Sequence, residues 1–206
     1  MKKFIIKAVQ IKVYILSALL LRVLFRIKRE GNIKIKNKKY IIASNHPSRI
    51  DPFLILVALP LNVFLKLVPI RFVTSQDYLN HWYQRIFLLP LGCISTKPKN
   101  NKKSLEILRE KLMKGETIFI FPKGELEKRD LSVNPKVGAV YLERKEKKSR
   151  IIPVKSCVSN KISLANILKR NIEVKIRFKK IFKHKDPRED LQILANNLME
   201  YIENGE

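Results

Sequence analysis

Two short segments of the chain hold residue types that could carry out chemistry together. In the first, residues 45–51, His46 stands five positions before Asp51. A carboxylate beside an imidazole fixes its tautomer, so that the second ring nitrogen can take a proton from a hydroxyl group. On a continuous helix the two side chains would point about 140° apart, so we expect a turn at Pro47 to bring them together. Two simpler interpretations stay open: Asp51 only caps a helix, and His46 is only a loop residue.

The second segment, residues 121–125, follows a continuous apolar run and reads Phe-Pro-Lys-Gly-Glu. A Pro-x-Gly turn at the carboxyl end of a strand exposes backbone N–H groups and lets a ligand approach closely. The same spacing also fits a plain tight turn. By itself, this segment therefore does not decide in favour of a binding site.

The elements that must position these segments alternate between strand and helix. Apolar runs predict strands at residues 40–44, 71–74, 93–96, 117–121, 151–154 and 172–178. Helical periodicity predicts helices at residues 53–59, 78–89, 101–114 and 137–145, and a last helix opening at Asp186 and Pro187. Asp51 is expected to cap the first helix and Glu189 to complete a capping box in the last. This alternation predicts an α/β fold with a mostly parallel central sheet flanked by helices.

Residues 4–25 predict a basic amphipathic helix that lies in a membrane interface. The longest uninterrupted apolar run, residues 13–21, is shorter than the roughly 20 residues of a spanning helix. No cleavage site of small residues follows it. The apolar stripe of this helix consists of Ile5, Val9, Val13, Leu16, Leu20 and Val23. The alternative is a helix packed on its own domain. We expect residues 1–28 to form the interface helix and residues 29–206 to form the catalytic domain.

The composition limits the kinds of fold and partner that this chain can have. With 206 residues, of which 46% are hydrophobic, the chain can bury the core of one domain, and general disorder is excluded. Lys and Arg number 43 against 18 Asp and Glu, a net charge of +25 that suggests a polyanionic partner such as nucleic acid, an anionic membrane or an acidic protein. Each basic residue near an anionic membrane surface adds about 1 kcal/mol of attraction. The two cysteines and three histidines are too scattered to predict a disulfide framework or a metal site.

Together and in this order, the two segments resemble the glycerolipid acyltransferase superfamily of 1-acylglycerol-3-phosphate (lysophosphatidic acid) acyltransferases. The first signature of that family, Asn-His-x4-Asp, is matched by Asn45, His46 and Asp51, with Ser48 inside it. The Phe-Pro-x-Gly part of the third block is matched by Phe121, Pro122 and Gly124. Looser matches are a Gly-x-Ile stretch leading to Lys97, the Lys-x-Gly element at Lys136, and the Ile-Pro-Val of residues 152–154.

The resemblance implies transfer of a fatty acyl group from acyl-CoA or acyl carrier protein to a hydroxyl of a lysophospholipid such as 1-acylglycerol-3-phosphate. In that reaction His46 would be the general base and Asp51 would orient it, with no cofactor and no metal. The expected location is the cytoplasmic face of the cell membrane, on anionic lipids and without nucleic acid as a partner. The substrate-binding residues implied are Asn45, Ser48, Arg49, Lys97, Phe121, Pro122, Lys123, Gly124, Glu125 and Lys136.

The third block departs from the family pattern. Its Glu is Lys123, its Thr is Glu125, and the Arg that in the family helps to hold the phosphate of the acceptor is Leu126. The departure favours, as an alternative, an acyltransferase that acts on a different lipid or polyol. A basic nucleic-acid-binding protein and a catalytically inactive scaffold of the same fold are further alternatives.

Overall fold

The structure, a computed structural model, describes residues 2–33, 35–36, 39–96, 101–124, 133–146, 148–160, 162–168, 171–182 and 188–205 of the chain. Its centre is a seven-stranded sheet in the order β1-β7-β6-β2-β5-β3-β4. Every neighbouring pair is parallel except β6 and β7. The strands are β1 (Arg26–Glu30), β2 (Lys39–Ser44), β3 (Ile70–Ser75), β4 (Ile94–Thr96), β5 (Thr117–Ile120), β6 (Ser149–Val158) and β7 (Glu173–Phe178). The predicted α/β fold with a mostly parallel sheet is confirmed.

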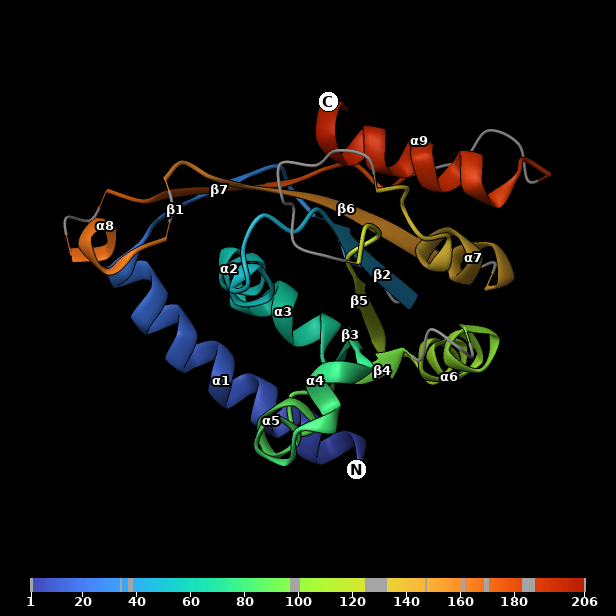
Figure 1. Cartoon of the computed structure of the whole chain (residues 1–206), viewed down its shortest axis with the longest axis horizontal. Coiled ribbons are helices and arrows are strands. Elements are labelled where there is room, and N and C mark those ends of the chain that lie inside the picture. The colour runs from blue at the N-terminus through green and yellow to red at the C-terminus, as the bar shows by residue number, and fades with distance from the viewer. Residues whose placement is uncertain are drawn as a thin grey trace.

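Helices cover both faces of this sheet (Figure 1). On one side lie α1, α2 and α3, and on the other α6, α7 and α9. The short helices α4 and α5 connect β3 to β4. The bounds are α1 (Lys3–Leu24), α2 (Asp51–Ala58), α3 (Leu61–Leu67), α4 (Gln76–Asn80), α5 (Trp82–Leu88), α6 (Asn101–Met113), α7 (Gly138–Lys145), α8 (Leu164–Leu168) and α9 (Leu191–Asn204).

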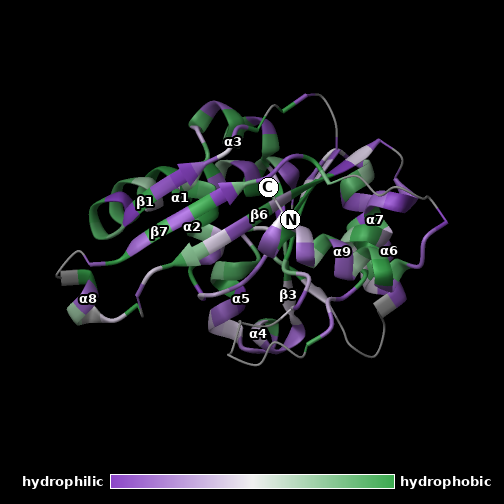
Figure 2. Ribbon diagram, turned by 90° about the horizontal axis from the view of Figure 1, so that it is seen from above, coloured by the Kyte–Doolittle hydropathy of each residue, from purple (hydrophilic) through white to green (hydrophobic). Residues whose placement is uncertain are grey.

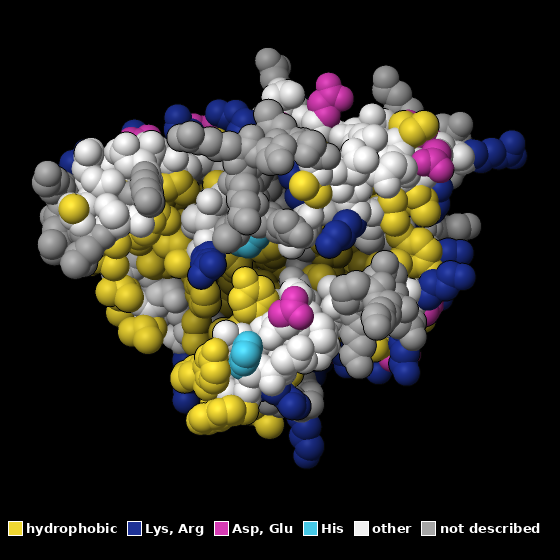
Figure 3. Space-filling view, viewed as in Figure 1, with side chains coloured by type: hydrophobic (Ala, Val, Ile, Leu, Met, Phe, Trp, Pro, Cys, Tyr) yellow, Lys and Arg dark blue, Asp and Glu magenta, His cyan; other side chains and the backbone are white. Residues whose placement is uncertain are grey.

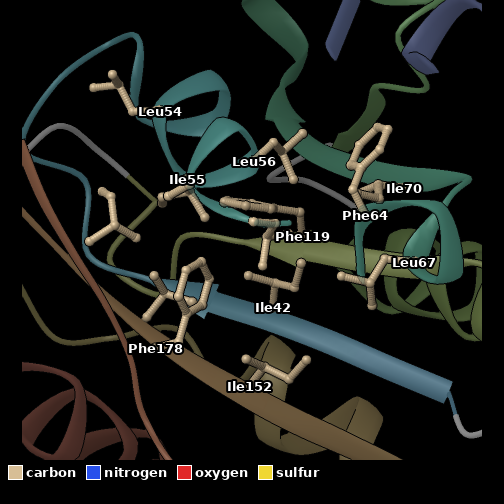
Figure 4. Packing of buried hydrophobic residues seen from close by; sticks show 14 of the residues in the cluster. Ile42, Leu54, Ile55, Leu56, Phe64, Leu67, Ile70, Phe119, Ile152 and Phe178 are labelled. Atoms are coloured by element: carbon tan, nitrogen blue, oxygen red, sulfur yellow. The ribbon is translucent and has the colours of Figure 1, made fainter. Parts of the chain in front are cut away.

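The core is divided by the sheet because successive side chains of a strand point to opposite faces. In β2, Ile42 packs toward α2 and α3, where Figure 4 shows it beside Phe119 and below Leu56 and Phe64. Its neighbours Ile41 and Ala43 belong to the other cluster, which also contains residues of α6, α7 and α9. All residues of β5 are buried, as expected for a central strand of a parallel sheet that is covered on both faces.

Some predicted element ends are wrong. The helix expected at residues 78–89 is two helices, α4 and α5, because the extended backbone of His81 (φ −83°, ψ 124°) interrupts it. The last helix begins at Leu191 because Asp190, and not Asp186, is its N-cap and accepts hydrogen bonds from the N–H groups of residues 192 and 193. Glu189 therefore precedes the cap and completes no capping box, while residues 186 and 187 lie outside the described residues.

Three elements were not predicted: β1, α3 and α8. The sequence of β1 is Arg-Ile-Lys-Arg-Glu, which has no apolar run, and the strand exists through its parallel pairing with β7. The division expected at residue 28 falls inside this strand, so the sheet includes part of the segment assigned to the interface helix.

Helix α1 packs on the domain through a face that contains polar side chains. Its buried residues are Ile6, Gln10 and Tyr14. The Gln10 amide accepts from the N–H of Ile70 (2.9 Å) and donates to the carbonyls of Ile70 (2.6 Å) and Leu91 (2.8 Å). The Tyr14 hydroxyl donates to the carbonyl of Leu59 (2.8 Å). These bonds fix α1 against the domain. The alternative of a helix packed on its own domain therefore holds for this face of α1.

The opposite face of α1 is apolar and exposed. Of the predicted stripe, Ile5, Leu16, Leu20 and Val23 are exposed, and Val9 and Val13 are half-buried. Seen from above, α1 runs behind β1 and β7 and is coloured largely as hydrophobic (Figure 2). Among the described residues, α1 is also the one helix that is long and apolar enough, by length and composition, to cross a membrane.

Candidate active site

The two segments that hold the candidate site residues meet at one edge of the sheet. Strands β2 and β5 are parallel neighbours, with Ala43 opposite Ile120, so residues 45–51 and 121–124 leave the sheet side by side. The ring of His46 stacks on that of Phe121, with 3.8 Å between ring centroids and 10° between ring planes. Ligand sites of α/β folds usually lie at this carboxyl edge of the strands. The stacking therefore joins both segments into one site and fixes the plane of the imidazole.

His46 and Asp51 are in direct contact. The Nδ1 atom of His46 lies 3.1 Å from Oδ2 of Asp51, and the intervening residues form a turn closed by the Asp51 N–H donating to the carbonyl of Ser48 (3.2 Å). The Asp51 side chain is 0% exposed and the His46 side chain 18%. Because a carboxylate only accepts hydrogen bonds, Nδ1 must carry the proton, which leaves the lone pair of Nε2 available. The geometry suits a general base whose ring is held by the carboxylate at Nδ1, so that Nε2 stays available.

Asp51 is held by more than the imidazole. Its Oδ2 accepts from the N–H of Ser48 (2.6 Å), and its Oδ1 accepts from the hydroxyl of Ser156 (3.1 Å). The interpretation of Asp51 as a helix cap is wrong, since α2 begins at Asp51 itself and its N-cap residue is Ile50. Hydrogen bonds to both oxygens compensate the loss of hydration of this buried carboxylate.

Ser156, on β6, is a site residue that the sequence analysis missed. Its backbone N–H donates to Oδ1 of Asn45 (2.7 Å), and its carbonyl accepts from Nδ2 of the same amide (2.9 Å). The buried side chain of Asn45 thus ties the end of β2 to β6 immediately before His46. A signal was present in the sequence, because Ser156 is two positions beyond Val154 and so shares its buried face.

The Phe-Pro-Lys-Gly segment forms a tight turn on which a lysine lies. Gly124 has φ +74° and donates its N–H to the carbonyl of Phe121 (2.9 Å). A Cβ atom at Gly124 would lie 2.7 Å from Nζ of Lys136. The positive backbone angle favours glycine here, and its lack of a side chain leaves room for the end of Lys136. The backbone N–H of Lys136 also donates to the carbonyl of the buried Pro122 (2.8 Å).

The structure brings together most of the other predicted site residues. Ser48 is half-buried and contributes both its N–H, to Asp51, and its hydroxyl, which accepts from the N–H of Ile50 (3.3 Å). Arg49 is exposed in the same turn, and Lys123 is half-buried beside Gly124. Lys97 and Glu125 lie outside the described residues. Within the described ranges, no group of three or more His, Cys, Asp or Glu side chains could hold a metal ion.

Comparisons with known proteins give the family and the fold of the chain. Residues 26–158 match the acyltransferase family, and this range includes both site segments and Ser156. No curated protein has a significant match. Among solved structures, the chain is similar to the crystal structure of the 1-acyl-sn-glycerophosphate (LPA) acyltransferase PlsC from Thermotoga maritima. The TM-score is 0.66 at 18% identity, and the match covers 97% of this chain and 79% of that one. The likeness to that enzyme is one of fold.

Proposed function

The chain belongs to the acyltransferase family, and on that basis we propose that it transfers a fatty acyl group from a thioester donor to a hydroxyl of a membrane lysolipid. The donor is acyl-CoA or acyl carrier protein, and the first acceptor to consider is 1-acylglycerol-3-phosphate. The observation that carries the proposal is the contact of His46 with the buried carboxylate of Asp51. The PlsC enzyme with a similar fold acts on LPA, as its name states.

The proposed reaction needs one base and no acyl-enzyme intermediate. Nε2 of His46 takes the proton of the acceptor hydroxyl, whose oxygen attacks the thioester carbonyl. Asp51 stabilises the resulting imidazolium through the bond at Nδ1. When the tetrahedral intermediate collapses, the C–S bond breaks and the departing thiolate takes the proton from Nε2. The products are an ester and a free thiol, and the imidazole is neutral again.

The turn at Gly124 supports an anionic acceptor. Lys123 is half-buried in this turn and Lys136 lies against it, so two lysines meet at the turn that follows Phe121, the ring that stacks on His46. Ammonium groups and turn N–H groups bind phosphate oxygens and stabilise a developing oxyanion. The Leu126 that replaces the family Arg leaves a different lipid or polyol as the alternative acceptor.

The proposed location is the cytoplasmic face of the cell membrane, with α1 in the plane of the interface. Gln10, Tyr14 and Arg22 bind backbone carbonyls of the domain at successive positions along α1, so the helix lies on the domain along its length. A helix held in this way exposes one apolar face and is suited to an interface rather than to a span. The high positive charge of the chain would also favour anionic lipids and an acidic acyl carrier protein.

The decisive experiment incubates the purified protein with acyl-CoA and acyl carrier protein donors and a panel of lysolipids and polyols, with products resolved by mass spectrometry. We expect a diacyl product from 1-acylglycerol-3-phosphate, and loss of that product in H46A by a factor of about 10² to 10⁴. The exposed α9 substitution E200Q is the control. If product forms only with another acceptor, the proposed acceptor is wrong but the proposed reaction stands. Near-normal turnover in a folded H46A would overturn the mechanism.

A further inference from the structure

Helix α5 exposes an unusual amount of apolar surface for its length. None of its seven residues, all of which the structure describes, is buried. Trp82 is 73% and Phe87 71% exposed, and Tyr83 and Ile86 are exposed as well. Single exposed apolar residues are common, but a contiguous cluster of three aromatic side chains and one aliphatic side chain on one short helix marks a surface that another apolar phase covers.

This cluster lies beside the first half of α1. The turn that follows α5 packs on the first half of α1, because the carbonyl of Leu91 accepts a hydrogen bond from Gln10. In the same turn, a Cβ atom at Gly92 would lie 3.1 Å from side-chain atoms of both Gln10 and Ile6. On the face shown in Figure 3, hydrophobic side chains gather along α1 and again over α5. The exposed apolar faces of the two helices are therefore held near each other in fixed geometry.

The charge around this surface identifies what covers it. Neither residues 1–29 nor residues 78–105 contain a single Asp or Glu. Lys7, Lys12 and Arg85, on the two helices, are exposed, and the exposed acid Asp77 lies outside these two ranges, on α4. A second copy of this chain would bring two sets of cations together and would be repelled. An anionic bilayer offers both an apolar layer and negative headgroups.

We infer that α5 is a second membrane contact, which inserts Trp82, Ile86 and Phe87 into an anionic bilayer beside α1. Trp and Tyr rings prefer the depth where hydrocarbon meets headgroups, and Trp82 and Tyr83 lie at the start of α5. Helix α4, which leads to this start, follows the carboxyl end of β3, the sheet edge that also holds His46. The inference rests on the proposed membrane location and adds that the bilayer contact extends to the side of the domain that carries the site.

Trp82 is the only tryptophan of the chain, so its fluorescence reports on α5 without a label. The full chain is mixed with vesicles of phosphatidylglycerol and phosphatidylcholine, and with vesicles of phosphatidylcholine alone. We expect the emission to shift to shorter wavelength with the anionic vesicles, and to be quenched by lipids brominated near the start of the acyl chain. Co-sedimentation with the vesicles without any shift or quenching would overturn the inference, because α1 alone would then bind.

A variant separates insertion from folding. In I86S/F87S, which keeps Trp82 as the reporter, we expect vesicle binding about tenfold weaker or more because two apolar side chains are lost. The matched control is I193S, which removes an exposed apolar side chain of α9. Equal binding of I86S/F87S and I193S would overturn the inference, and so would a concentration-dependent dimer that excludes vesicles. Acyl transfer in detergent micelles, measured on the same samples, tests the proposed function separately, because a micelle requires no docking to a bilayer.

Discussion

The site at the sheet edge and the surface of α1 and α5 both differ from the usual distribution of polar and apolar side chains, but in opposite ways. At the site, polar atoms are withdrawn from water, and the buried Asp51 is satisfied by His46, Ser48 and Ser156. On the α1 and α5 surface, apolar atoms are left in water. The first departure is compensated inside the chain by hydrogen bonds, and the second can be compensated only from outside. Changes in one region should therefore leave the other intact.

The largest expected effect separates chemistry from membrane binding. In D51N, the amide can donate to Nδ1 of His46 and so favour the tautomer whose Nε2 carries the proton. We expect kcat to fall by about 10² to 10⁴, while vesicle co-sedimentation stays equal to that of E200Q. A kcat within a few-fold of the unmodified protein would show that the carboxylate does not set the tautomer.

The next effect tests whether α1 is held by its polar face. Q10L makes the helix more apolar but leaves the N–H and carbonyl of Ile70 and the carbonyl of Leu91 without their partner. We expect the free energy of unfolding in urea to fall by about 1–3 kcal/mol for each buried group left unpaired. L20Q, on the exposed face of the same helix, should change it by less than about 0.5 kcal/mol. A larger fall in the free energy of unfolding in L20Q than in Q10L would show that α1 is not held by its polar face.

The smallest effect concerns Ser156. S156A removes one hydrogen bond to Oδ1 of Asp51 and leaves the backbone bonds to Asn45 in place. We expect a several-fold lower kcat with an unchanged KM, and a loss of stability of about 1 kcal/mol. S149A is the matched control, since Ser149 is also buried on β6 but its hydroxyl donates to the carbonyl of Glu143. Equal kinetic effects of both variants would reduce Ser156 to a structural residue.

The sequence predicted what local patterns encode. The buried runs of β2 and β5 and the leucine spacing of α6 are each visible within a dozen residues. The contact of His46 with Asp51 was also expected, because only a short turn separates them. Ser156 escaped because its partner Asp51 is 105 positions away and their contact depends on the neighbouring positions of β2 and β6.

The misread parts are those where tertiary contacts override local preference. Gln10 and Tyr14 lie outside the predicted apolar stripe of α1, yet they face the domain because they satisfy carbonyl groups at helix and strand ends. Strand β1 is nearly all charged, and its side chains pair with those of β7, as in the contact of Glu30 with Arg177 (2.7 Å). Such partners are known only once the order of the strands is known.

The pairing of β1 with β7 also bears on the order of events during synthesis on the ribosome. Among the described residues, β7 is the sole strand beside β1, which ends at Glu30, whereas β7 begins only at Glu173. The contacts of α1 with Leu59, Ile70 and Leu91 likewise need chain that is made later. Until residue 91 has been made, the first helix lacks part of its docking site on its own domain. If the proposed membrane location holds, the nascent helix would be free to meet lipid before the sheet is complete.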